Sequence, residues 1–401
     1  INTNVTRNGS YYDANVTAGL FNLNNKKNSY SLRGKLAVSQ LYGGMMEKRV
    51  GQAHNVTFAK SSGNWQFQIF QDAADEKYDI NDMGILFNNN FLDHYFWTSY
   101  RWTKPKKWYN RIQINYNAYY SMLYKKMPNQ VIDTRTQGFR TNVNANIQMK
   151  NLWWAGLFVG YVPKGYDFYE PRNQGYAFRT PTRWQFNPWV ETNFAKKYAM
   201  FLNYFVGLRS LFNSPNHEIN LGHRYRFNDK FSISHDFTYN PAINDAGFYQ
   251  SYYENGALKD IIFSRRDLKT IQNLLSFKYN FNSRSGITFR MRHYFSKVHQ
   301  KELYDLDAEG NLKPTIHTSV AMENRTLNFF NIDAVYTWQF APGSFLNIVW
   351  KDQSVVGDDK IHYSYFKNLE RTVSAPQNNN LSVKVIYFLD YVDFKKWRKK
   401  K

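Results

Sequence analysis

Hydrophobic and polar residues alternate along most of the chain, and the segment SGITFRMRHYFSKV at 285–298 shows this pattern clearly. Ile287 and Met291 fall on one side of the alternation, while Arg290 and Arg292 fall on the other. Successive side chains of a strand point to opposite faces of its sheet. The pattern therefore predicts strands that have one apolar face and one polar face.

The same two-residue period recurs from end to end, whereas helical periodicity is scarce. The segment INTNVTR at the start of the chain adds one more strand, because a strand must precede residue 11 if both ends of a closed barrel lie on one side. We expect about 16 to 18 strands, since 242–270 could be a folded loop or an extra hairpin. The other predicted strands lie near 11–23, 30–41, 64–72, 91–102, 111–124, 139–150, 183–194, 198–210, 218–227, 231–240, 273–283, 285–298, 330–340 and 381–392.

Two kinds of connection join these strands. Short polar turns are predicted at 24–28, 61–64, 103–107, 150–152, 195–197, 228–230, 283–286 and 341–344. Long polar loops are predicted near 43–51, 76–90, 124–133, 168–181, 242–268, 300–324 and 354–379. Short periplasmic turns and long extracellular loops are typical of outer-membrane barrels. We therefore predict an all-β fold, a transmembrane antiparallel β-barrel over 1–394 as one domain, followed by a basic tail at 395–401.

Composition supports a barrel in the bacterial outer membrane. The mean hydropathy is −0.64, as in soluble proteins, yet aromatic residues make up 18% of the chain. No apolar run reaches the length of about 18 residues that a transmembrane helix needs. A barrel accounts for both values, because half of each strand is polar and aromatic girdles mark both interfaces.

The net charge of +21 indicates anionic partners. Outer-membrane lipid and lipopolysaccharide, anionic solutes and nucleic acid all carry the right charge. Nucleic acid is disfavoured, because the basic residues are spread over strand faces and turns instead of forming one patch. Cysteine is absent, which excludes disulfides and thiolate metal sites.

Several segments also resemble a known family. They are INTNVTRNG, DANVT, DINDMG, FRMRHYFSKV, YDLDAEGNL and APGSFLNIVWK. Together they are similar to the C-terminal barrel domain, of unknown function, of Bacteroidota outer-membrane proteins. In that family a domain similar to family-nine carbohydrate-binding modules precedes the barrel. The resemblance implies that the module and the opening strands are missing here, and KKWRKKK extends past the last strand as a periplasmic tail or an added feature.

The polar strand faces carry the candidate site. Alternation places far more cations than carboxylates on the side that faces the lumen, which would favour anionic solutes. In the alternative interpretation, the same side chains bind backbone carbonyls, carboxylates or a plug from the missing N-terminal part. The candidate lumenal cations are Arg111, Arg140, Arg224, Arg226, Lys278, Arg290 and Arg292.

Tryptophans near strand ends are interpreted first as an interface girdle, although aromatic platforms also stack sugars. The candidates are Trp102, Trp153, Trp184, Trp338 and Trp350, together with Trp65, Trp97, Trp108, Trp154 and Trp189. On the strand at 285–298, Phe289 and Phe295 join Ile287 and Met291 on the side expected to face lipid. His293 is the polar exception on that side and is expected near an interface.

No metal site, cofactor or enzymatic activity is predicted. His223 and His235 face each other across the turn at 228–230 without further ligands. The segment DLDAEG at 305–310 opens like a calcium loop, but Ile316 stands where the closing glutamate belongs. No catalytic motif is found.

Two functions remain open at this stage. One is passage or binding of a solute across the outer membrane through a cationic lumen. The alternative is a non-transporting scaffold or accessory subunit of a larger complex for secretion, nutrient uptake or barrel assembly. Possible protein partners are the chain's own N-terminal carbohydrate-binding-like domain or plug, and other outer-membrane or surface lipoprotein subunits.

Overall fold

The computed structural model describes residues 1–361, 364–392 and 395, so the predicted basic tail lies outside the described residues except for Lys395. The chain forms one antiparallel sheet of 19 strands and a separate two-stranded hairpin, β10–β11. The strands are β1 (Asn2–Val5), β2 (Asp13–Asn24), β3 (Tyr30–Tyr42), β4 (Arg49–Lys60), β5 (Trp65–Ala74), β6 (Phe91–Trp102), β7 (Tyr109–Met122), β8 (Thr136–Met149), β9 (Trp154–Val162), β10 (Gly165–Asp167), β11 (Phe178–Thr180), β12 (Arg183–Glu191), β13 (Tyr198–Arg209), β14 (Ser214–Arg226), β15 (Phe231–Glu254), β16 (Ala257–Asn282), β17 (Ser285–Leu306), β18 (Leu312–Pro314), β19 (Arg325–Ala341), β20 (Ser344–Asp358) and β21 (Asn378–Ile386).

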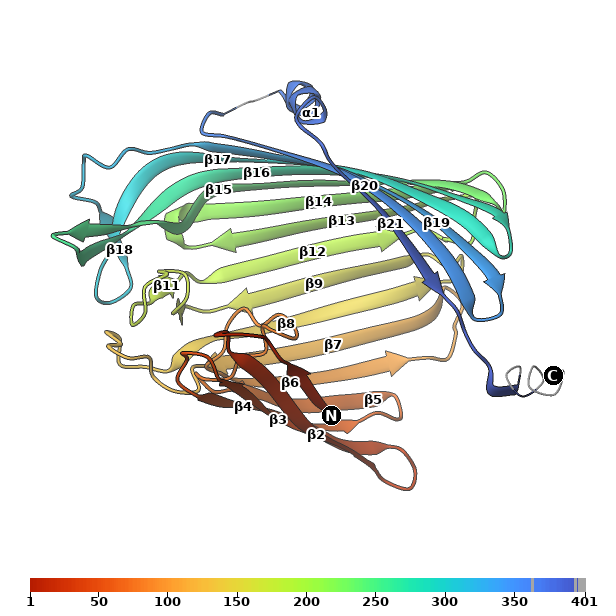
Figure 1. Ribbon diagram of the computed structural model, residues 1–401, viewed down its shortest axis with the longest axis horizontal. Helices are drawn as coiled ribbons and strands as arrows, with labels where there is room; N and C mark the ends of the chain where they lie inside the picture. Colours follow the sequence, from red (N-terminus) through yellow and green to blue (C-terminus); the bar gives the residue numbers. More distant parts are fainter. Residues whose placement is uncertain (362–363, 393–394, 396–401) are drawn as a thin grey trace.

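The large sheet is a meander, because each long strand pairs with the next long strand along the chain. The predicted strand at the start of the chain is confirmed as β1. In the described part of the chain no pairing joins β1 to β21, so these two strands form the edges of the sheet. Figure 1 shows that the strands near both edges come forward of the middle strands, so the sheet is curved like a trough.

The predicted alternation stays in register from strand to strand. Phe289 of β17 lies opposite Phe277 of β16 and Ala334 of β19, and the next residue, Arg290, lies opposite Ser276 and Asp333. Most apolar side chains therefore share one face of the sheet, and most polar side chains share the other. We call these the outer face and the inner face.

The predicted loop at 242–268 is wrong, because most of it extends β15 and β16. These strands have 24 and 26 residues and pair almost to the hairpin tip, with register shifts at three bulges. The 300–324 loop is also shorter than predicted, since β17 continues to Leu306 and β18 pairs back onto it. Bulges allow a twisted hairpin to carry such residues within its ladder, and they obscure the two-residue period.

The predicted environment of His293 and Phe295 is also wrong. The predicted loop at 354–379 holds the helix α1 (Tyr365–Val373), which packs on the outer face of β17, β19 and β20. Figure 1 shows α1 outside the curve of the sheet. His293 and Phe295 are only 4% and 1% exposed beneath it. The Tyr365 hydroxyl lies 2.9 Å from His293 Nδ1, so the polar exception on this face is paired with the helix.

A hydrogen-bonded amide pair fastens α1 to the sheet. Asn328 Nδ2 of β19 donates to Asn368 Oδ1 at 3.1 Å, and Asn368 is fully buried. Ser354 Oγ of β20 donates to the backbone carbonyl of Thr372 at 2.6 Å. The outer face turns polar at these positions, so it binds α1 through hydrogen bonds instead of presenting apolar side chains.

Replacing Asn368 with alanine should weaken the docking of α1 by about 1–3 kcal/mol, because buried Asn328 then loses its partner. Hydrogen exchange of the 364–374 backbone, measured by mass spectrometry, should become faster in Asn368→Ala. Phe366→Ala, on the exposed side of the same helix, is the control and should leave the exchange unchanged. Equal exchange in all three proteins would contradict this account of the helix.

Candidate functional site

The middle of the inner face is covered by amide side chains that bond one another across strands. Asn115 Nδ2 of β7 donates to Asn144 Oδ1 of β8 at 2.7 Å, and Asn117 Nδ2 donates to Asn142 Oδ1 at 2.8 Å. An amide has two donor hydrogens and an acceptor oxygen, so each keeps capacity for further hydrogen bonds after pairing sideways. Between the positions of Arg111 and Arg140, the wall is therefore polar and neutral.

Aromatic rings support several of the predicted lumenal cations. The Arg111 guanidinium lies 5.4 Å from the ring centroid of Trp154, and the Arg140 guanidinium lies 4.0 Å from that of Tyr119. Arg224 and Arg226 both donate to the backbone carbonyl of Phe194, the latter at 3.2 Å. Part of the alternative interpretation is thus observed, since two of the seven cations bind a backbone carbonyl.

The remaining three cations also belong to the inner face by their register. Lys278 pairs with Thr288, Arg290 with Asp333 and Arg292 with Asn331. Among the described residues, none of the seven candidate cations lies within 4.0 Å of a carboxylate oxygen. The inner face therefore carries positive charge that carboxylates do not neutralise at contact distance.

The predicted girdle tryptophans divide between the two faces. Trp102, Trp184, Trp338 and Trp350 lie on the outer face and are exposed, and Trp153 is exposed in a turn. Trp97, Trp154 and Trp189 instead lie on the inner face, in register with polar neighbours. The alternation along each strand could have predicted the inner position. Trp189, for example, is separated by an even number of residues from Glu191 and Arg183 and so lies on the same face. The position of the three tryptophans near strand ends instead favoured the interpretation as girdle residues.

A separate segment covers part of the inner face. Residues 163–182, here called the covering segment, leave the sheet after β9, form the β10–β11 hairpin and return at β12. Gly165 packs directly on β8, where an added Cβ would lie 2.4 Å from the carbonyl oxygen of Gln137. Only glycine allows this close approach.

The covering segment is hydrogen-bonded to a loop on one side and to strand β15 on the other. The Tyr169 hydroxyl donates to the Asn89 carbonyl at 2.7 Å, and the Phe248 backbone N–H donates to Glu170 Oε1 at 2.9 Å. Asn173 Nδ2 donates to Ser251 Oγ at 2.8 Å. The segment thus bridges the 75–90 loop and the extended β15 strand.

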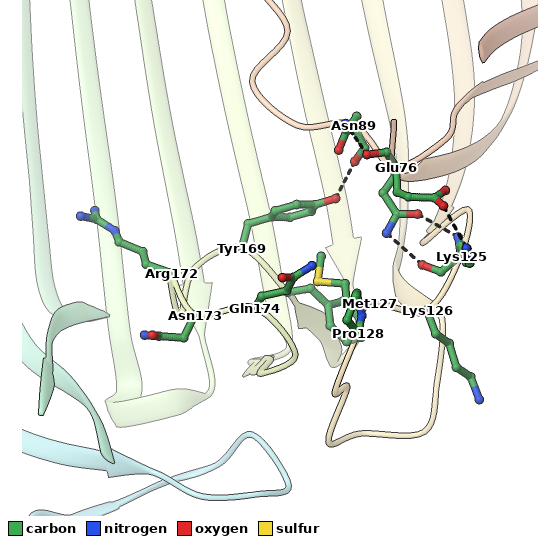
Figure 2. A pocket seen from close by; sticks show the side chains of 12 residues that line it. Glu76, Asn89, Lys125, Lys126, Met127, Pro128, Tyr169, Arg172, Asn173 and Gln174 are labelled. Atoms are coloured by element: carbon green, nitrogen blue, oxygen red, sulfur yellow. Dashed lines mark hydrogen bonds and ion pairs between the residues drawn. The ribbon is translucent and has the colours of Figure 1, made fainter. Parts of the chain in front are cut away.

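Two cavities adjoin the covering segment. One, of about 720 Å³, lies between the segment and the inner face of β6, β7 and β8 and is lined by Asp93, Tyr119 and Arg140. The other, of about 560 Å³, opens between the segment and the loops near Glu76 and Lys125 (Figure 2). The Lys125 ammonium, 2.9 Å from Glu76 Oε1, holds the pKa of this loop carboxyl below its usual value.

The segments with weak metal motifs have structural roles. His223 Nε2 lies 3.1 Å from His235 Nδ1, so the two rings pair with each other. Asp307 Oδ1 accepts the backbone N–H groups of Glu309 and Asn311, which makes DLDAEG a hydrogen-bonded hairpin tip. In the part of the chain that the structure describes, no group of three His, Cys, Asp or Glu residues could hold a metal ion. Over the same residues, no helix has the length and apolar character needed to cross a membrane.

Gly165→Ala should lift the covering segment off β8, because the new methyl group cannot fit 2.4 Å from the Gln137 oxygen. We expect proteolysis within 163–182 to become faster, while the sheet keeps its thermal stability. Gly138→Ala is the matched control, since a Cβ on this neighbouring β8 glycine meets nothing within 4 Å. Unchanged proteolysis of Gly165→Ala would contradict the close contact.

Comparison with known proteins gives one family. The family model described as "Domain of unknown function (DUF5916)" matches residues 1–398. No curated protein matches the chain.

Proposed function

Because the chain belongs to the DUF5916 family, which is defined by a domain of unknown function, we propose its activity from geometry and charge alone. We propose that it is an outer-membrane β-barrel whose cationic inner face binds and passes anionic solutes. The observation that carries this proposal is the pair of opposite faces: an exposed apolar outer face, and a polar inner face whose candidate cations have no carboxylate at contact distance.

The outer face supports the membrane location. Large apolar side chains stand exposed on strand after strand, among them Ile69, Ile114, Leu157 and Leu202. Fully burying one such side chain is worth about 1.5–3 kcal/mol, so an apolar face of this extent needs a cover. Lipid is the cover that suits a curved sheet with aromatic residues on its outer side.

The barrel is the closed form of the observed sheet. Open edges do not occur in hydrocarbon, where each unpaired backbone group costs several kcal/mol. In the proposed barrel, the outer edges of β1 and β21 are therefore paired, with each other or with further strands. We include in this proposal the resemblance to Bacteroidota outer-membrane proteins that carry a carbohydrate-binding-like module. That resemblance agrees with a location in the outer membrane.

A second candidate function has one observation in its favour. Helix α1 folds back over the outer face and leaves Phe366 77% exposed, where a partner subunit could pack. A scaffold or accessory subunit would use that surface and would need no open lumen. Co-purification of a stoichiometric partner that is lost in Phe366→Ala would favour this alternative over the pore.

Placing an arginine on the outer face, and in a second variant on the inner face, tests the membrane location. Leu202 is 38% exposed on the outer face, and its neighbour Asn203 lies on the inner face. An arginine facing lipid near mid-membrane costs about 2–4 kcal/mol. An arginine at position 203 stays on the polar face and loses only the hydrogen bond from Asn187, which is worth about 0.5–1.5 kcal/mol.

We therefore expect Leu202→Arg to lose stability and heat-modifiable gel migration in detergent, while the matched control Asn203→Arg keeps both. Wild-type protein should fractionate with outer membranes. A chain that stays freely soluble without detergent, or a Leu202→Arg variant as stable as the control, would overturn the proposal.

Ion selectivity tests the pore. Single channels in planar bilayers should prefer chloride over potassium, and Arg290→Gln with Arg292→Gln should lower that preference by at least about twofold, because local positive charge concentrates anions. Lys367→Gln, on the exposed side of α1, removes one charge outside the barrel and should leave the ratio unchanged. If correctly folded protein produced no channel current in bilayers, this result would contradict solute passage and favour the scaffold function.

A further inference from the structure

We propose that the inner face binds acidic oligosaccharides, chains of sugars that carry carboxylate or sulfate groups. The binding site is an aromatic platform made by Trp154, Trp189 and Phe201. This inference rests on the proposed pore and names the class of solute that the pore would take.

The three rings come from three neighbouring strands. Trp154 of β9 and Phe201 of β13 both lie in register with Glu191 of β12. Trp189 is two residues from Glu191 on β12, and its ring centroid lies 6.4 Å from that of Phe201. Trp154 is the diagonal neighbour of Trp189 across β9 and β12, a separation that long aromatic side chains can span.

Trp189 packs closely against the wall because the residue opposite it is a glycine. A Cβ built on Gly156, directly opposite Trp189, would lie 2.3 Å from Nε1 and 2.5 Å from Cε2 of the indole. The ring thus occupies the space of the missing side chain. The indole therefore packs against β9 at Gly156 and stays partly exposed on the inner face. A flat ring can stack on the C–H face of a sugar, since the negative ring face attracts polarised C–H groups.

Amide groups surround the platform. Gln148 lies in register with Trp154, and Asn203 lies in register with Trp189. Asn203 Oδ1 already accepts from Asn187 Nδ2 at 2.6 Å, which leaves its own NH₂ group to donate. Amides offer donors and acceptors together, which suits sugar hydroxyls that also do both.

One cation adds the preference for acids. Arg111 lies in register with Gln148, and its guanidinium stands 5.4 Å from the Trp154 ring. Arginine binds carboxylate and sulfate oxygens through two parallel N–H groups. Glu191, the carboxylate in register with the platform, would repel an acidic group, so the acid is directed to the Arg111 side. A simple inorganic anion would use Arg111 alone and would not need the rings.

Calorimetric titration of the purified protein in lipid nanodiscs tests the inference. The probes are tri-galacturonate, maltotriose as a neutral sugar of equal length, and sulfate as a simple anion. We expect saturable binding of tri-galacturonate that is at least about tenfold tighter than binding of the other two. Trp189→Ala and Arg111→Gln should each weaken it about tenfold, which corresponds to about 1.4 kcal/mol.

Matched controls separate the site from general damage. Trp184→Phe changes an outer-face tryptophan on the same strand and should bind normally. Gly156→Ala should weaken binding by displacing the indole, whereas Gly19→Ala, whose Cβ would meet nothing within 4 Å, should not. Equal binding of maltotriose would overturn the acidic class, and equal binding of sulfate would overturn the platform.

The pore and the oligosaccharide site can fail separately. If the protein formed anion-selective channels but did not bind tri-galacturonate, the proposed pore would stand and the proposed oligosaccharide site would be wrong. Binding of tri-galacturonate by a protein that is silent in bilayers would keep the site and remove passage. Binding that persists unchanged in Trp189→Ala would overturn the assigned location.

Discussion

The structure depends on a single constraint, that each strand keeps its apolar and polar faces in register with the next strand. A slip of one residue would move every side chain of a strand to the opposite face. The pairing of Phe289 with Phe277 and Ala334 shows that the register holds across three strands. Short turns maintain this register, because a tight turn fixes how the two strands that it joins are aligned. Both the apolar exterior and the cationic interior follow from this register.

Polar side chains on the outer face are tolerated because they bond one another. His223 bonds His235, and His235 Nε2 lies 2.9 Å from Asn273 Oδ1. Asn273 Nδ2 then donates to the Tyr365 hydroxyl at 2.8 Å, and this hydroxyl reaches His293. This series of hydrogen bonds crosses from β14 to β17 and ends beneath α1. Buried polar groups without partners are costly, so the helix completes a network that the strands alone leave open.

The sequence was sufficient to predict most of the strands, because the two-residue period depends only on which face is wet. It predicted the inner position of Arg290 and Arg292 for the same reason. It did not predict β4, β9 or β20, and the sheet has 19 strands instead of the expected 16 to 18. It could not predict the docking of α1, since the face that packs on the sheet is the polar one, with Asn368 and Thr372 buried. The apolar stripe of Phe366, Leu369 and Val373, which would normally mark the buried side of a helix, leaves Phe366 and Val373 exposed. The extension of β15 and β16 was hidden by bulges.

The covering segment makes the two ends of the sheet unequal. At the end with long loops, Phe178 of this segment stacks on Phe263 of β16 with centroids 5.0 Å apart, inside a small apolar core. A second core holds Phe168 and Leu123 on the other side. Apolar contacts on both sides anchor the segment more firmly than surface hydrogen bonds would. The proposed aromatic platform lies near the opposite end, where short turns connect β8 to β9 and β12 to β13. In the proposed barrel, a solute that entered by the loops would pass the anchored segment before it reached the rings, so selection by size would precede selection by chemistry.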